Sequence, residues 1–252
     1  MKLKDKIAII TGVSSGIGKA IAMLFAKEGA NVVAAARRKE KLDEIAGQAE
    51  KQGRRIIPVC TDVVLKDDLD NLIDTTMKEF GRIDILVNNA GVMDDFSPVA
   101  EITDEMWEEV LAINLTAPFR LCKQTIPIML EQNGGVIINM SSIAGLYSTR
   151  GGIAYAVSKH GLVVLTRNTA FMYADKGIRC NAICPGAVDT DMIRGFTNIN
   201  EYGMVKCQSG AANVPRMGTT EEIAKIALFL ASDDSSFVNG VALAADAGWT
   251  AY

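Results

Sequence analysis

The sequence of 252 residues contains one histidine, His160. A single imidazole cannot build a multi-histidine metal site, and it would have to serve any Ser-His or Cys-His nucleophile system alone. The side-chain inventory therefore argues against several classes of metalloenzyme and hydrolase, and no metal site is predicted.

The sequence also lacks an excess of basic residues and long apolar runs. Its 26 lysines and arginines stand against 30 acidic residues, for a net charge of -4, which gives no electrostatic footprint for nucleic acid or an anionic bilayer. The apolar run at residues 7–10 ends at Thr11-Gly12, too early for a signal peptide, and no stretch reaches membrane-spanning length. We expect neither nucleic acid nor a membrane as a partner.

Cysteine patterns typical of disulfides or metal sites are absent as well. The number of cysteines is odd and no two are spaced as C-x-x-C; they are Cys60, Cys122, Cys180, Cys184 and Cys207. This pattern indicates reduced thiols, most of them buried as small apolar residues. We therefore expect a cytoplasmic protein.

Short β-branched runs alternate with longer helical patterns along the whole chain. Strands are expected at residues 6–11, 31–36, 55–60, 83–88, 136–140, 178–184 and 241–245, and helices near 16–29, 38–52, 66–80, 103–132, 155–176 and 219–232. Several strands are apolar at nearly every position, which indicates burial on both faces. The pattern predicts an α/β fold, a doubly wound parallel sheet of about seven strands with helices on both faces.

No change in composition and no linker divides the chain, so residues 1–252 are expected to form a single domain. Residues 186–214 interrupt the alternation of strands and helices. A long connection inside a compact fold is usually functional or mobile, and this segment is the candidate substrate lid.

A glycine-rich turn, Thr11-Gly-Val-Ser-Ser-Gly-Ile-Gly18, lies between the first strand and the first helix. Glycines let the backbone turn tightly and approach a pyrophosphate, which then binds the free N–H groups at the helix start. Such a turn can also be merely structural, but its place in the chain favours dinucleotide binding. The spacing G-x-x-x-G-x-G differs from the more widespread G-x-G-x-x-G.

Further segments follow in order along the chain: Asn88-Asn-Ala-Gly91, Ser141-Ser-Ile-Ala-Gly145, Tyr155-Ala-Val-Ser-Lys159, Pro185-Gly186 and the terminal Asp246-Ala-Gly248. With the glycine-rich turn they make the sequence resemble the short-chain dehydrogenase/reductase family over essentially its whole length, with one glycine of the family's Asp-Gly-Gly ending replaced. The resemblance implies a Rossmann-type fold and a nicotinamide cofactor. It also implies a homotetramer, with the helices at 103–132 and 155–176 in one interface and residues 249–252 near another.

The resemblance assigns the cofactor-binding residues. It expects Ser14 to assist Arg37, Asp62-Val63 to contact the adenine, and Asn89-Ala90-Gly91 to pass beneath the ribose. The full expected set is Gly12, Ser14, Ser15, Gly16, Ile17, Gly18, Arg37, Arg38, Asp62, Val63, Asn89, Ala90, Gly91, Tyr155, Lys159, Pro185, Gly186, Val188 and Thr190.

The end of the second strand bears on the choice of cofactor. NAD enzymes usually place a carboxylate there to hold the ribose 2′-hydroxyl, whereas arginine accommodates a 2′-phosphate. Here Ala36 is followed by Arg37 and Arg38, whose charge-assisted hydrogen bonds to a phosphate would be worth about 1.5–3 kcal/mol each. NADP(H) is therefore favoured over NAD(H). The alternative is that both arginines begin a solvated helix with Lys39 and Lys41.

Tyr155 and Lys159 are four residues apart and would share one face of a helix. An adjacent ammonium and an oxidised nicotinamide both favour the phenolate, so a lowered pKa is expected for Tyr155. Tyr155 would then act as general acid in ketone reduction and general base in alcohol oxidation. Taken alone, such a pair would more often be a surface contact.

The family resemblance adds two catalytic residues to Tyr155 and Lys159. Ser142 would hydrogen-bond the substrate oxygen, with Ser141 left as a strand-end residue. Asn114 would hold a water that links the lysine to solvent. Pro118 lies four residues later and has no N–H for the Asn114 carbonyl, so that carbonyl is expected to be free, although a simple kink is the alternative. His160 is interpreted as a packing or interface residue.

The substrate is expected to be apolar, because apolar residues follow two of the loops. They are Met93, Phe96, Met192, Ile193, Phe196, Ile199, Tyr202, Met204 and Val205. An adaptable lining of this kind suits a hydrophobic alcohol or ketone, although these residues could also form subunit contacts. We expect an NADP(H)-dependent oxidoreductase that interconverts a secondary alcohol and a ketone on a free apolar molecule of hydroxysteroid type.

Two other functions remain open at this point. A 3-oxoacyl-thioester reductase of fatty-acid synthesis typically carries basic residues before the fifth strand, where this chain has Glu131-Gln132-Asn133. A non-catalytic cofactor-sensing protein would have no physical need for the set Asn114, Ser142, Tyr155 and Lys159.

Overall fold

The structure, a computed structural model, describes residues 1–194, 199–209 and 213–251. These residues form one seven-stranded parallel sheet with the order β3-β2-β1-β4-β5-β6-β7. The strands are β1 (Ile7–Thr11), β2 (Asn31–Ala36), β3 (Ile56–Cys60), β4 (Ile85–Asn88), β5 (Gly135–Met140), β6 (Ile178–Pro185) and β7 (Ala242–Ala245). The strand order reverses between β1 and β4, which creates a switch point where ligands bind in such sheets.

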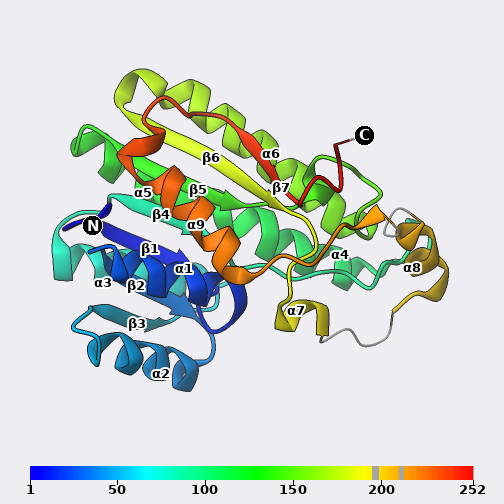
Figure 1. The fold of residues 1–252 in the computed structure, drawn as a ribbon, viewed down its shortest axis with the longest axis horizontal. Coiled ribbons are helices and arrows are strands. Elements are labelled where there is room, and N and C mark those ends of the chain that lie inside the picture. The colour runs from blue at the N-terminus through cyan, green and yellow to red at the C-terminus, as the bar shows by residue number, and fades with distance from the viewer. Residues whose placement is uncertain (195–198, 210–212, 252) are drawn as a thin grey trace.

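Helices cover both faces of the sheet (Figure 1). They are α1 (Gly16–Lys27), α2 (Lys39–Glu50), α3 (Lys66–Phe80), α4 (Asp104–Leu111), α5 (Ala117–Glu131), α6 (Ile153–Tyr173), α7 (Asp191–Arg194), α8 (Glu201–Gln208) and α9 (Thr220–Ala231). One apolar cluster joins α1, α2 and α9 to one face of the sheet, and a second joins α3, α5 and part of α6 to the other. The predicted doubly wound fold is confirmed.

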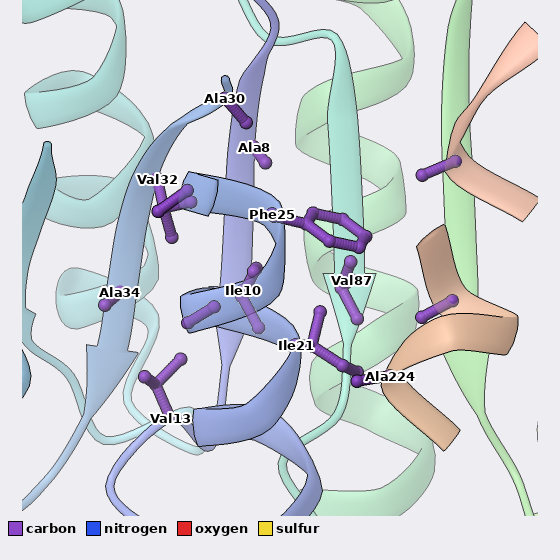
Figure 2. Packing of buried hydrophobic residues seen from close by; sticks show 14 of the residues in the cluster. Ala8, Ile10, Val13, Ile21, Phe25, Ala30, Val32, Ala34, Val87 and Ala224 are labelled. Carbon is purple, nitrogen blue, oxygen red and sulfur yellow. The ribbon is translucent and has the colours of Figure 1, made fainter. Parts of the chain in front are cut away.

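Side-chain alternation along the strands divides the core between the two faces. Ala8 and Ile10 of β1 pack on one side and Ile9 on the other. Figure 2 shows Ile21 and Phe25 of α1 lying over β1 and Val87 of β4. Because β1 is packed on both faces, the position of the loop that follows it is fixed by the core.

The predicted elements lie within a few residues of the observed ones, with one departure. The helix expected at 103–132 consists of α4, a π turn at Ala112–Thr116, and α5. Pro118 lies in the first turn of α5 and has no N–H to donate. The helix widens here instead of breaking: the N–H of Ala117 donates to the carbonyl of Ala112, five residues back.

The candidate lid lies beyond the carboxyl ends of the strands, where Figure 1 shows α7 and α8. Its described part contains these two short helices, and Val188 near its start forms a β-bridge with Gly218, which follows the lid. Residues 195–198 and 210–212 lie outside the described residues, and the lid function stays a prediction. Within the described part of the chain, no helix is both long and apolar enough to cross a bilayer.

Candidate active site

A cavity of about 810 Å³ opens at the carboxyl end of the sheet, where β1 and β4 diverge. It extends from the β1–α1 loop and the end of β2 to Tyr155 and the lid. All the predicted cofactor-binding residues line it, together with Ser142, Tyr155 and Lys159. Asn114 is the one predicted site residue that does not. The fold thus places predicted site residues from position 12 to position 190 around a single cavity.

Glycines in the β1–α1 loop allow other atoms to come close to its backbone. Gly12 and Gly16 have φ of +72° and +56°, a left-handed conformation that favours glycine. A Cβ on Gly12 would lie 2.8 Å from Nδ2 of Asn89. Ser15 is the N-cap of α1 but its side chain makes no cap hydrogen bond, and the first turn carries no acidic residue. The positive end of α1 is therefore open to an anionic ligand, which fits the pyrophosphate of a dinucleotide.

Thr11 joins the ends of the two central strands, a role that the sequence did not reveal. Its Oγ1 accepts hydrogen bonds from the backbone N–H groups of Asn89 and Ala90, each at 3.0 Å. The Asn89 side chain donates in return to the Thr11 carbonyl at 2.9 Å. These bonds hold the segment after β4 against the glycine loop, so the two segments expected to bind the cofactor form one surface.

The end of β2 presents two arginines to the cavity and no carboxylate. The guanidinium of Arg38 donates to Ser14 Oγ at 2.8 Å and to Ser15 Oγ at 3.1 Å. Arg38, the N-cap residue of α2, is thus the arginine that reaches the glycine loop, and the expectation that Ser14 assists Arg37 stays a prediction. Arg37 is exposed and lines the cavity beside it.

The segments after β3 and β6 complete the cofactor side of the cavity. Asp62 is held by its backbone N–H, which donates to Oδ2 of Asp68 at 2.7 Å. Gly186 follows β6 and hydrogen-bonds the carbonyl of Ala245. A Cβ on Gly186 would lie 2.7 Å from Cβ of Asp246, so the glycine is required for packing against the chain after β7.

Tyr155 and Lys159 lie on the first turns of α6 and are 8% and 4% exposed. The ammonium of Lys159 is 5.5 Å from the centre of the Tyr155 ring and donates to the carbonyl of Met140 at 2.9 Å. The Ser142 side chain lies close enough to the phenol to lower its pKa, whereas Ser141 Oγ donates to the backbone carbonyl of Lys159 at 3.0 Å. The structure thus distinguishes the two serines and pairs Ser142 with Tyr155.

The pKa of the phenol is governed by its burial. Burial raises the pKa of Tyr155 to about 12; the Ser142 side chain opposes this, and Asp94 and Cys184 add to it. Burial also lowers the pKa of Lys159 to about 8, against an opposing effect of Cys184. In the protein on its own, the cost of desolvating a buried phenolate dominates. The lowered pKa expected for Tyr155 beside an oxidised nicotinamide stays a prediction. At neutral pH the phenol is a proton donor.

Asn114 is fully buried inside the π turn. Its Oδ1 accepts from the N–H of Val92 at 2.9 Å, and its Nδ2 donates to the Val92 carbonyl and to Ser158 Oγ at 2.8 and 3.1 Å. The side chain therefore anchors the loop after β4 to α6. A water relay through the Asn114 carbonyl stays a prediction.

The substrate side of the cavity is mostly apolar. Met93, Phe96, Met192 and Met204 line it as expected, whereas Tyr202 and Val205 are exposed. Ile199 is not part of the cavity wall. Phe196 lies outside the described residues, and the side chain of Ile193 is not among those described.

Arg150 and Trp249 are among the wall residues that could not be found from the sequence. The guanidinium of Arg150 lies 4.9 Å from the centre of the Trp249 ring, and both side chains face the cavity. No local pattern could have indicated this pair, because the residues are 99 positions apart (249 minus 150). His160 takes no part in the site: its Nδ1 lies 2.9 Å from the carbonyl of Ala156, on its own helix.

Comparisons with known proteins agree with this geometry. A family model described as Enoyl-(Acyl carrier protein) reductase matches residues 12–250. The chain is 44% identical to 3beta-hydroxysteroid dehydrogenase 2 of Eggerthella lenta, over 99% of this chain and 96% of that protein. It is 37% identical to the 3-oxoacyl-(acyl-carrier-protein) reductase of Thermotoga maritima, over 98% of this chain and 99% of that protein.

Solved structures show the same similarity. Levodione reductase matches with a TM-score of 0.91 and 33% identity, over 99% of this chain and 100% of that chain. A Beutenbergia cavernae protein solved with bound NADP gives a TM-score of 0.89 and 34% identity, over 100% and 99%. Together these full-length matches show that the chain belongs to the short-chain dehydrogenase/reductase family, whose members are oxidoreductases that use nicotinamide cofactors.

Proposed function

We propose that this protein is an NADP(H)-dependent oxidoreductase that interconverts a secondary alcohol and a ketone on a free, apolar substrate of hydroxysteroid type. The observation that carries this proposal is the pairing of the Tyr155 phenol with Ser142 in a cavity whose substrate side is walled by Met93, Phe96 and Met204. The 44% identity to a 3beta-hydroxysteroid dehydrogenase supports the steroid class.

The side chains divide the acid–base work. In ketone reduction Tyr155 donates its proton to the carbonyl oxygen, and Ser142 donates a hydrogen bond to the same oxygen as negative charge develops on it. In alcohol oxidation the phenolate of Tyr155 accepts the hydroxyl proton. A nicotinamide, when bound, supplies or accepts the hydride. The ammonium of Lys159 favours the phenolate, and its hydrogen bond to Met140 fixes its place.

The preference for NADP(H) rests on the end of β2. Ala36 offers no carboxylate to repel a 2′-phosphate, and Arg37 and Arg38 line the cavity at that point. Hydrogen bonds to Ser14 and Ser15 hold the Arg38 guanidinium in place, which reduces the entropy lost on binding a phosphate. The Beutenbergia cavernae protein, described as NAD(P) dependent and solved with NADP bound at low occupancy, supports NADP binding by a relative of this fold.

A carbonyl panel tests the proposal. Initial rates of NADPH and NADH consumption would be measured with 3-ketosteroids, aliphatic ketones and 3-oxoacyl thioesters. The proposal predicts fastest turnover with NADPH and a ketosteroid. Equal rates with NADH would contradict the cofactor assignment, and preference for the thioester would contradict the substrate assignment.

A 3-oxoacyl-thioester reductase is the second candidate, favoured by the identity to the Thermotoga maritima reductase. Before β5, where basic residues would dock an acidic carrier, this chain has Glu131-Gln132-Asn133. The Gln132 side chain is bonded at 2.9 Å to both the N–H and the carbonyl of Ile83. Gln132 is thus committed to internal hydrogen bonds, and the exposed Glu131 and Asn133 offer no cation to a carrier protein.

We also propose that the protein forms a homotetramer. Large apolar side chains are exposed on α5 and α6, where the sequence predicted an interface: Phe119, Val157, Val164, Phe171 and Met172. An apolar surface spread over neighbouring turns of a helix is the kind that marks a protein–protein interface. Light scattering of the purified protein would give the mass of four chains, and a monomeric mass would refute the proposal.

A further inference from the structure

Asp94 is a buried carboxylate behind the cavity wall, near Tyr155. It lies in the loop between β4 and α4, is 3% exposed and does not line the cavity. A buried carboxylate needs hydrogen-bond donors to compensate for its lost hydration. Its Oδ2 accepts from the backbone N–H of Tyr155 at 2.9 Å, and its Oδ1 accepts from that of Phe96 at 3.3 Å. The N–H of Gly152 also donates to it.

Two of these donors belong to the start of α6, a helix without a cap of its own. Its N-cap residue, Gly152, has no side chain, and its first turn contains no acidic residue. The N–H groups of a first turn need acceptors from elsewhere, and negative charge is favourable at that end of a helix. Asp94 provides both, although it is separated from α6 by more than fifty residues of sequence.

Gly152 is the residue type that leaves room for this carboxylate. Its φ of -69° is ordinary for any residue, so backbone conformation does not demand glycine. A Cβ built on Gly152 would collide with Oδ1 of Asp94. The glycine and the aspartate are therefore complementary: Asp94 occupies the place where the side chain of an N-cap residue would stand.

The capped residue is also the residue that carries the catalytic phenol. Tyr155 is the third residue of α6, and its N–H makes the 2.9 Å bond to Asp94. Its ring lies against Gly151, where a Cβ would be 2.8 Å from Cδ1 of the ring. The Tyr155 backbone and ring are thus held by two neighbouring contacts, and a shift of about 1 Å at such a group is enough to reduce turnover substantially.

The same loop contacts the substrate side of the site. Met93 and Phe96, on either side of Asp94 and Asp95, line the cavity. Phe96 has a φ of +66°, an uncommon conformation for a phenylalanine that must be held by its surroundings. The carbonyl of Asp95 accepts from the N–H of Asn200 at 2.8 Å, just before α8. The loop therefore connects the start of α6 to the candidate lid.

We propose that Asp94 is a positioning residue for the reaction, a cap supplied from the β4–α4 loop that fixes the first turn of α6 and with it the phenol of Tyr155. This inference rests on the proposed role of Tyr155 as the proton donor and acceptor. Asp94 would act through Tyr155, without contacting substrate or cofactor.

The negative charge of Asp94 raises the pKa of the Tyr155 phenol, as burial does. The groups that face Tyr155 are Lys159 on α6, Cys184 of β6, the Ser142 hydroxyl and Asp94. Burial raises the pKa of Asp94 itself, Asp95 adds to this effect, and the N–H donors from Tyr155, Phe96 and Gly152 oppose it. Removal of the Asp94 charge should therefore lower the pKa of Tyr155.

The test compares Asp94→Asn and Asp94→Ala with Asp95→Asn. Asparagine keeps the size of Asp94 and one acceptor oxygen but turns an NH₂ toward one of the donors. Asp95→Asn removes a charge from the same loop, and the Asp95 side chain bonds to Ser97 rather than to α6. Amide hydrogen exchange of residues 153–157 reports on the cap independently of activity, so it remains informative even if no carbonyl is turned over.

For Asp94→Asn we expect faster exchange in the first turn of α6 and a kcat lowered by about tenfold, with KM and dinucleotide affinity changed by less than about twofold. The acid limb of the pH profile for alcohol oxidation should move to lower pH. Asp94→Ala should show larger effects in the same directions, and Asp95→Asn should match the parent protein.

Three results would overturn the assignment. One is unchanged exchange in the first turn of α6 in Asp94→Asn. Another is a loss of dinucleotide affinity in proportion to kcat, which would indicate general damage to the fold. The third is an equal effect of Asp95→Asn. If Asp94→Ala fails to fold, Asp94→Asn alone decides among these outcomes.

Discussion

At Tyr155 two influences on the pKa of the phenol oppose one another. Burial raises it to about 12, while the Ser142 side chain lowers it. Lys159 lies 5.5 Å from the ring centre and is itself buried, with a pKa lowered to about 8. The protein on its own therefore keeps Tyr155 protonated, ready for reduction, and oxidation requires that this proton be removed.

This balance predicts opposite pH dependences in the two directions. The fraction of phenolate grows about tenfold for each pH unit below its pKa, so initial rates of alcohol oxidation should rise steadily between about pH 7 and 10. Rates of ketone reduction should not rise over that range. Stopped initial-rate assays in both directions check this, and an oxidation rate that peaks below neutral pH would contradict it.

The Arg38 guanidinium provides a test of the proposed NADP(H) preference. Its guanidinium is held by Ser14 and Ser15 beside the expected 2′-phosphate position. Arg38→Ala should weaken NADPH binding by about 10- to 100-fold and leave NADH binding nearly unchanged. Lys41→Ala is the control, because Lys41 is exposed and pairs with Glu44. Equal weakening of both dinucleotides in fluorescence titrations would argue against NADP(H) specificity.

At the scale of elements, the glycine loop between β1 and α1 combines two demands. Gly12 needs a left-handed backbone, and its neighbour Asn89 leaves no room for a Cβ. Gly53 has a similar φ of +67° but no atom within 4 Å of a Cβ. A comparison of substitutions at Gly12 and Gly53 therefore separates the cost of a left-handed backbone from the cost of a steric clash.

We predict that Gly12→Ala and Gly53→Ala both lose about 1 kcal/mol or more of unfolding free energy. Only Gly12→Ala should also lose dinucleotide binding, because the added methyl group pushes the β4 segment away from the loop. Thermal denaturation and binding titrations measure the two effects. Normal dinucleotide affinity in Gly12→Ala would show that this loop does not form the binding surface.

At the scale of the whole molecule, the fold was predictable because its signals are local and repeated. Strands that are apolar at every position, such as β1, indicate burial on both faces wherever they lie in the chain. The glycine loop, the segment after β4 and the pair Tyr155–Lys159 are likewise short motifs. Each was placed from a few adjacent residues.

What could not be predicted depends on contacts between distant segments or on burial. The choice of Arg38 over Arg37 as the partner of Ser14 depends on how the chain turns into α2. The raised pKa of Tyr155 depends on burial by segments from across the sequence. The bond from Tyr155 to Asp94 has no sequence pattern at all, since a carboxylate in a loop can face any direction.

We propose that the Tyr155 phenol transfers the proton while the rest of the cavity binds the dinucleotide. The most direct test is turnover of Tyr155→Phe with NADPH and a ketosteroid, beside NADPH binding by the same variant and a Tyr202→Phe control on the exposed face of α8. We expect Tyr155→Phe to lose about 10²- to 10⁴-fold in kcat, because a general acid is removed, and to keep NADPH affinity within about twofold of the parent protein. A Tyr155→Phe variant that turns over as fast as Tyr202→Phe would contradict the proposal.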